Sequence, residues 1–222
     1  MSGQPGEPGP ALPPKPASRP WWRVLLPAAP DVVALLVAQG ELTVGGMDTF
    51  NEWSHNGGPD GATAVRSAQH RAYHARRELL AALQSALSTP VGQEHLYTLS
   101  ERIDRILTQA RDAVREAEVM GRAPDAYTGR MAERLAGGTR ALVKGFELLR
   151  KDPEEAGRRA DAAGAAVHHV ERDYREAMAE LLQGDDLRAI VARQTLYRRY
   201  LDIAEAIVAV ADKLWFVVLH GA

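Results

Sequence analysis

Two histidines, His70 and His74, are separated by four positions in a stretch that is rich in alanine and arginine. Imidazole nitrogens spaced in this way on a helix can bind one transition metal ion together. Counting about 100° per residue, both side chains fall roughly 160–200° from the apolar stripe of their helix, so they face water. Because an open site with only two ligands is a poor metal centre, we interpret this pair as surface residues. His168 and His169 point about 100° apart and are interpreted in the same way.

No other set of reactive side chains has a recognisable spacing. Glu52 and His55 form a single Glu-x-x-His, whereas a di-iron bundle site needs such a pair on each of two facing helices. The sequence has neither a Gly-x-Ser-x-Gly nucleophile turn nor a Gly-x-x-x-x-Gly-Lys-Ser/Thr phosphate loop. It also has no cysteine, which excludes disulfides, thiolate zinc sites, iron–sulfur clusters and a cysteine nucleophile. These absences favour a protein that is not an enzyme.

The composition is that of an ordinary soluble domain, with 45% hydrophobic and 25% charged residues among 222. The net charge is −2, and basic residues alternate with acids, as in Arg172-Asp173 and Arg175-Glu176. There is therefore no electrostatic case for a nucleic-acid partner. No run of about 20 apolar residues could span a membrane. The opening MSGQPGEPGP has neither the basic nor the apolar part of a secretory signal.

Long amphipathic helices must position whatever side chains carry the function. The clearest lies within Thr89–Met120, where apolar residues recur every three or four positions and form a stripe roughly 120° wide. The stripe consists of Leu96, Leu99, Ile103, Ile106, Leu107, Ala110, Ala113, Val114 and Ala117. Further helices are expected at about 62–87, 125–150 and 152–181, and from the turn at 184–186 to Leu219.

The first helical region begins at Asp31, which can cap it. Its glycines, Gly40, Gly45 and Gly46, predict a kink or a break, and residues 56–61 (NGGPDG) predict a loop. No segment alternates with a period of two for long enough to be a strand. We therefore expect an all-α protein, a bundle of about six helices.

The domain is expected to occupy residues 21–222, after a disordered Pro- and Gly-rich tail at 1–20. Trp21 and Trp22 would cap the open end of the bundle, with contact to a membrane surface as the alternative. Residues 77–83 (RELLAAL) are echoed by residues 175–181 (REAMAEL), and Ile103-Asp104 is echoed by Leu201-Asp202 at the same separation. These echoes hint at two related three-helix halves.

Residues 88–107, STPVGQEHLYTLSERIDRIL, resemble the signature of the PhoU-like phosphate transport regulators, which are often paired with Pit-type phosphate transporters. In that family a Thr-Pro turn is followed by an acidic pair, an Ile-Tyr or Leu-Tyr step, and a Leu-Asp element. The corresponding residues here are Thr89-Pro90, Glu94-His95, Leu96-Tyr97 and Ile103-Asp104. Leu25-Leu26-Pro27 is similar to the Leu-Phe-Pro step of the family, so the resemblance runs from about Leu25 to His220 and implies a bundle of two three-helix halves.

The resemblance also implies where a metal would bind. PhoU-like proteins carry repeated acidic pairs four residues apart, and such pairs on adjacent helices can hold a multinuclear metal cluster. The pair positions here are Gln69/Tyr73, Asp104/Thr108, Val167/Glu171 and Leu201/Glu205. Asp104, Glu171 and Glu205 each lie roughly 80–120° to the same side of their helix's apolar stripe. Packing that brought these flank positions to one face could bind one ion weakly, but we interpret them as solvated residues or ion-pair partners.

By resemblance, the chain is expected to be a non-enzymatic accessory or regulatory protein of inorganic phosphate transport. It would bind a Pit-type transporter or its regulators through helix faces, in the cytoplasm, with peripheral attachment to the inner face of the membrane as a further option. A homo-oligomer is left open. No cofactor is expected beyond one weakly bound divalent metal ion. The alternative is a metal-binding bundle, either a storage protein or a metal-dependent enzyme, which would need at least four convergent ligands.

Overall fold

The computed structural model describes residues 31–86, 89 and 91–220, and these residues form six α-helices and no strand. The helices are α1 (Val32–Asn56), α2 (Pro59–Ser85), α3 (Gln93–Met120), α4 (Ala126–Leu148), α5 (Pro153–Leu181) and α6 (Leu187–His220). The prediction of an all-α protein is confirmed. The predicted tail at 1–20 and the cap at Trp21 and Trp22 lie outside the described residues.

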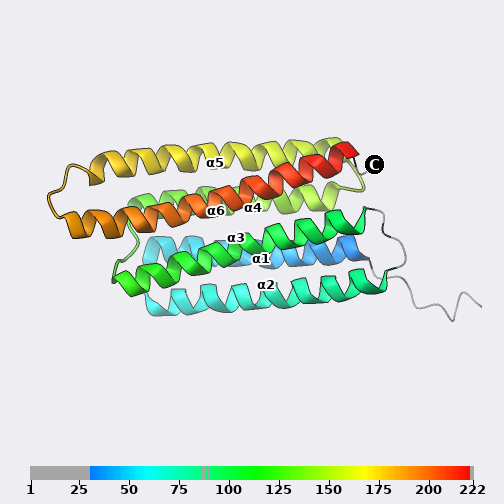
Figure 1. The fold of residues 1–222 in the computed structure, drawn as a ribbon, viewed down its shortest axis with the longest axis horizontal. Helices are drawn as coiled ribbons and strands as arrows, with labels where there is room; N and C mark the ends of the chain where they lie inside the picture. Colours follow the sequence, from blue (N-terminus) through cyan, green and yellow to red (C-terminus); the bar gives the residue numbers. More distant parts are fainter. Residues whose placement is uncertain (1–30, 87–88, 90, 221–222) are drawn as a thin grey trace, which may run out of the picture.

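The helices form two three-helix units that pack side by side (Figure 1). Helices α1, α2 and α3 contact one another in the first unit, and α4, α5 and α6 do so in the second. Between the units, α1 packs on α4 and α3 packs on α6, so these four helices form the centre. Helices α2 and α5 lie on opposite outer sides (Figure 1). The same pairing pattern in both units confirms the expectation of two three-helix halves.

The helix ends follow the capping signals of the sequence. Asp31 accepts a hydrogen bond from the backbone N–H of Ala34 at 3.1 Å, so it is the N-cap of α1. Asp125 begins α4 by accepting from the N–H of Thr128 at 2.9 Å, in a reciprocal capping box. Gly121 ends α3 with φ of 60°, a left-handed conformation that suits glycine. Each such side-chain cap stabilises its helix by about 1 kcal/mol.

The core is apolar and continuous across both units. All nine residues of the predicted α3 stripe are buried. Tyr200 on α6 and Phe50 on α1 are also fully buried, with ring centroids 5.2 Å apart, and they join the two units. None of the described helices is both long enough and apolar enough to cross a lipid bilayer.

Of the predicted kink or break in the first helix, the break is wrong, because α1 runs without interruption from Val32 to Asn56. Two of its three glycines, Gly40 and Gly46, serve close packing instead. A Cβ atom on Gly46 would lie 2.5 Å from Cδ2 of Leu107 on α3, and one on Gly40 would lie 2.9 Å from Cγ2 of Val143 on α4. The glycines therefore let α1 approach two neighbouring helices, and this packing outweighs their low helix propensity.

The predicted loop at 56–61 is also wrong in its extent. Asn56 ends α1, and α2 already begins at Pro59, so only Gly57 and Gly58 separate the two helices. Both have positive φ, 67° and 85°, which favours glycine and reverses the chain within two residues. Pro59 then occupies the first turn of α2, where the missing N–H of proline removes no helical hydrogen bond.

Candidate functional site

Asp104 lies between α2 and α3, where arginines surround it rather than other acids. Its Oδ2 is 4.0 Å from Nη1 of Arg76, and its side chain is 16% exposed. Burial raises the pKa of Asp104, and the positive charges of Arg76 and Arg111 oppose that rise. Nη1 of Arg111 also lies 3.5 Å from Oε1 of Gln69, a position where the resemblance places an acid. Guanidinium groups thus face Asp104 and Gln69, two of the positions where the resemblance implied metal-binding carboxylates.

The raised pKa predicts how Asp104 affects stability. The folded state binds a proton on this carboxyl more tightly than the unfolded chain does. The stability that the protonated carboxyl contributes is therefore lost as the pH rises from the ordinary pKa of 3.8 through the higher pKa of the folded state. We expect Asp104→Asn, which cannot ionise, to become more stable relative to the parent protein as the pH rises over this range. Urea midpoints at about pH 4 and about pH 7 measure this difference.

The control for this prediction is Asp212→Asn, because Asp212 is an exposed aspartate on another helix, α6. It should track the parent protein at both pH values. A stability difference between Asp104→Asn and the parent protein that does not change with pH would contradict the prediction.

Glu171 and Glu205 lie on the outer surface, in local ion pairs. Oε2 of Glu171 is 3.9 Å from Nη1 of Arg175 and 3.7 Å from Nδ1 of His168, all on α5. Oε1 of Glu205 is 3.2 Å from Nη2 of Arg198, on the same helix, α6. The interpretation of these acids as ion-pair partners agrees with this geometry.

The packing does not bring Asp104, Glu171 and Glu205 together into one site. The described parts of α3 and α5 make no contact with each other, so Asp104 and Glu171 belong to separate surfaces. Across residues 31–86, 89 and 91–220, no three His, Asp or Glu side chains are close enough to hold a metal ion. Metal binding by any one of these acids stays a prediction.

The histidines singled out from the sequence lie on the surface. His70 and His74 on α2 are exposed, as predicted, and so are His168 and His169 on α5. His55 is also exposed, and its ring lies against α4, where a Cβ atom on Gly129 would be 2.6 Å away. The solvent-facing orientation inferred from helical periodicity is therefore confirmed for the α2 pair.

Sequence reasoning missed the most deeply buried acid, Asp173 on α5. Its side chain is 3% exposed, and its Oδ2 lies 2.6 Å from Nε of Arg134 on α4, with Nε of Arg130 at 3.7 Å from Oδ1. The signal was present, since Asp173 lies three residues after Val170 and four before Ala177, on the apolar stripe. An acid on a buried stripe predicts a basic partner on the facing helix.

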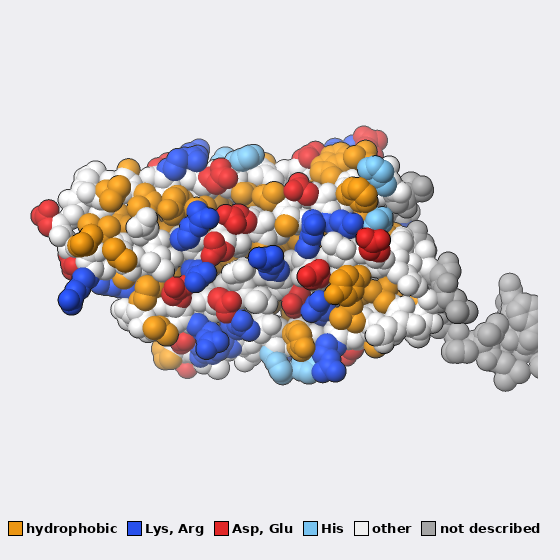
Figure 2. Space-filling model, viewed as in Figure 1, with side chains coloured by type: hydrophobic (Ala, Val, Ile, Leu, Met, Phe, Trp, Pro, Cys, Tyr) orange, Lys and Arg blue, Asp and Glu red, His pale blue; other side chains and the backbone are white. Residues whose placement is uncertain are grey.

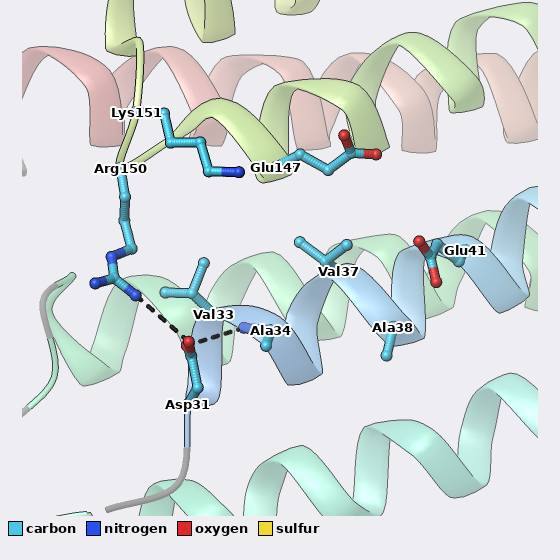
Figure 3. A pocket seen from close by; sticks show the side chains of 9 residues that line it. All are labelled: Asp31, Val33, Ala34, Val37, Ala38, Glu41, Glu147, Arg150 and Lys151. Carbon is cyan, nitrogen blue, oxygen red and sulfur yellow. Dashed lines mark hydrogen bonds and ion pairs between the residues drawn. The ribbon is translucent and has the colours of Figure 1, made fainter.

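A hollow on the described surface lies between the start of α1 and the end of α4 (Figure 3). It measures about 630 Å³ and is open to solvent. Val33 and Val37 contribute apolar lining, and Glu41 and Lys151 contribute charges of both signs. Asp31 at its rim caps α1 and lies 3.5 Å from Nη1 of Arg150. The lining offers no nucleophile with an adjacent base, so its geometry carries no catalytic function.

Exposed apolar side chains gather where α5 turns into α6. Leu182, Leu187 and Val191 are 66%, 71% and 53% exposed, and we call these three residues the hairpin tip. The α5–α6 hairpin extends beyond the other helices at the left of Figure 1, and hydrophobic side chains are visible at that end in Figure 2. Exposed apolar groups that cluster at a projecting end are typical of a protein-binding surface.

Comparison with known proteins places the fold. No protein-family model matches the chain, and no curated protein matches it. Among solved structures, a PhoU-like protein from Shewanella oneidensis MR-1 superposes with a TM-score of 0.65 and 16% sequence identity. The likeness covers 85% of this chain and 99% of that one. The chain therefore has the PhoU-like fold, as the resemblance of residues 88–107 implied.

Proposed function

We propose that this chain is a non-enzymatic accessory protein that regulates inorganic phosphate transport by binding a membrane transporter of the Pit type, or a regulator of one. The observation that carries the proposal is the PhoU-like fold, shared with a neighbour over 99% of that neighbour's length. The resemblance of residues 88–107 to the PhoU-like signature supports it from the residues themselves. In this proposal the protein works in the cytoplasm, at the inner face of the membrane.

The charged side chains of the bundle support binding rather than catalysis. The acids that the PhoU-like pattern marks, such as Asp104 and Glu205, face guanidinium groups of Arg76 and Arg198. These groups therefore suit a static electrostatic role on a helix face.

The hairpin tip supplies the surface for a partner in this proposal. Burying Leu182, Leu187 and Val191 against another protein would remove apolar side chains from water, at roughly 25 cal/mol for each Å² buried. Arg188 and Asp186 flank these residues. Charged groups would therefore surround the apolar contacts, as at the polar rim of many protein interfaces.

Binding to a transporter tests the proposal directly. The full chain is immobilised, and a Pit-type phosphate transporter from the same genome, held in lipid nanodiscs, is passed over it in a biolayer interferometry experiment. We expect saturable binding, and we expect Leu187→Glu to weaken it at least tenfold, because a charge at the tip must be desolvated on docking.

Leu219→Glu is the matched control, because Leu219 lies on the same helix near its other end and is 69% exposed, against 71% for Leu187. It should bind like the parent protein. No binding of the parent protein to the transporter or to its regulators would overturn the proposed function, whereas equal binding by both variants would place the interface elsewhere.

A further inference from the structure

His70 and His74 on α2 turn their Nε2 atoms toward each other, 3.0 Å apart. Their ring planes are at 86°, and their ring centroids are 4.4 Å apart. Both residues are exposed, and histidine side chains are visible along the α2 edge of the molecule in Figure 2, beside basic side chains. Two imidazole nitrogens that face each other at the surface are open to a ligand from solvent.

The separation of the two nitrogens matches the spacing of neighbouring ligands on one metal ion. With metal–nitrogen bonds of about 2.0–2.1 Å, two ligand atoms lie about 2.9 Å apart at a right angle and about 3.3 Å apart at the tetrahedral angle. The observed 3.0 Å is closer to the right angle. Right angles occur in the tetragonal geometries of Cu²⁺ and Ni²⁺, whereas Zn²⁺ prefers a tetrahedron.

The spacing in the sequence alone predicts a poor, open centre here, but the structure turns the two Nε2 atoms toward each other at 3.0 Å. We therefore propose that His70 and His74 form a two-histidine chelate for a divalent transition metal ion, with Cu²⁺ and Ni²⁺ favoured over Zn²⁺. The ion replaces the hydrogen bond between the two Nε2 atoms, and each neutral ring donates its lone pair. No third His, Asp or Glu among the described residues completes the set, so water fills the remaining positions. The pair is not expected to bind Mg²⁺ or Ca²⁺, because these ions require oxygen ligands.

The charges around the pair influence which ligands fill the open positions. His70 also lines a shallow groove between α2 and α3 that contains four arginines: Arg66, Arg71, Arg111 and Arg115. Two of them are paired, Arg66 with Glu118 at 2.8 Å and Arg111 with Asp112 at 2.7 Å. The groove therefore has a net positive charge. This charge weakens the binding of a bare dication and favours an anion as a further ligand on the open side of the bound metal.

Titration of the full chain with CuCl₂ and NiCl₂ tests the proposal. Isothermal calorimetry at about pH 7.5 gives the affinity and the stoichiometry. We expect one site for each chain and at least a tenfold loss of affinity in His74→Ala. Cu²⁺ electron paramagnetic resonance should show two equatorial nitrogens in the parent protein and at most one in His74→Ala. Cu²⁺ should bind more tightly than Ni²⁺, and both more tightly than Zn²⁺.

The control is His168→Ala/His169→Ala, which removes two exposed histidines that are adjacent on α5 and therefore point about 100° apart. Its affinity for Cu²⁺ should be within about twofold of that of the parent protein. This result would show that the placement of His70 and His74, rather than the number of histidines, determines binding. Circular dichroism checks that each variant folds, as expected for exposed positions. An unchanged affinity in His74→Ala, a single-nitrogen signal in the parent protein, or no saturable binding at all would overturn the proposal. None of these outcomes bears on transporter binding.

Discussion

Replacement of Tyr200 by alanine is expected to lower the free energy of unfolding by about 3–5 kcal/mol, the cost of deleting a large aromatic ring from a packed core. Tyr200 is fully buried on α6, with its ring 5.2 Å from that of Phe50 on α1. It therefore spans the boundary between the two three-helix units, where surrounding helices cannot close a cavity without moving. Urea unfolding followed by circular dichroism measures the change.

Tyr200→Phe separates the hydroxyl from the ring. The phenol oxygen lies 2.8 Å from Oγ of Ser54, which is fully buried, and burial raises the pKa of Tyr200, so the hydroxyl keeps its proton. Loss of that hydroxyl is expected to cost about 1–2 kcal/mol, because Ser54 loses its partner. Tyr97→Ala is the matched control, since Tyr97 is 46% exposed, and it should change stability by less than about 0.5 kcal/mol. A loss in Tyr200→Ala no larger than in Tyr97→Ala would contradict the prediction.

Arg134→Met is expected to cost about 3 kcal/mol, the second largest effect. The substitution leaves the carboxylate of Asp173, which is 3% exposed, without the guanidinium 2.6 Å away. A buried charge that loses its partner keeps the full cost of desolvation. Arg130, with Nε 3.7 Å from the carboxylate, compensates in part, so the lower end of the range for broken buried pairs applies.

A double-mutant cycle decides whether the cost is that of an unpaired charge. Arg134→Met/Asp173→Asn has no buried charge at this position, and we expect it to recover most of the stability lost in Arg134→Met. Arg172→Met, which removes an exposed ion pair with Glu176 on the same helix, α5, should leave the urea midpoint unchanged. If the double variant were as unstable as Arg134→Met, lost packing rather than unpaired charge would be the cause.

The helices and their buried faces could be predicted from the sequence because helical periodicity is a local property. The α3 stripe from Leu96 to Ala117 is buried without exception, and Asp125 and Asp152 begin α4 and α5 as capping residues do. In the sequence, the two-unit architecture was visible as two short echoes, one of them between residues 77–83 and 175–181, and as an implication of the PhoU-like resemblance. The structure shows it in the matched packing of α1 on α4 and α3 on α6.

What the sequence could not supply was information about facing helices. The low helix propensity of Gly46 predicts a break in the helix. Whether Gly46 breaks the helix or instead makes room for the side chain of Leu107 depends on a neighbour more than 50 residues away. The angular position of Asp104 on its helix was predictable. The arginine that faces it, Arg76 on α2, was not, because relative height and rotation of two helices are set by packing. A different limit applies to the 3.0 Å separation of the Nε2 atoms of His70 and His74, because it depends on the rotamers of two side chains on one helix.

The matched contacts between the two three-helix units have a consequence for how the molecule holds together. When α1 meets α4 and α3 meets α6, equivalent surfaces face each other, which is the arrangement of an isologous dimer. Here a short connection, from Gly121 to Asp125, keeps both surfaces on one polypeptide. Their association is therefore intramolecular, at an effective concentration on the order of millimolar. Dilution that would separate two free subunits leaves this pseudo-dimer intact, whatever the concentration of the protein in the cell.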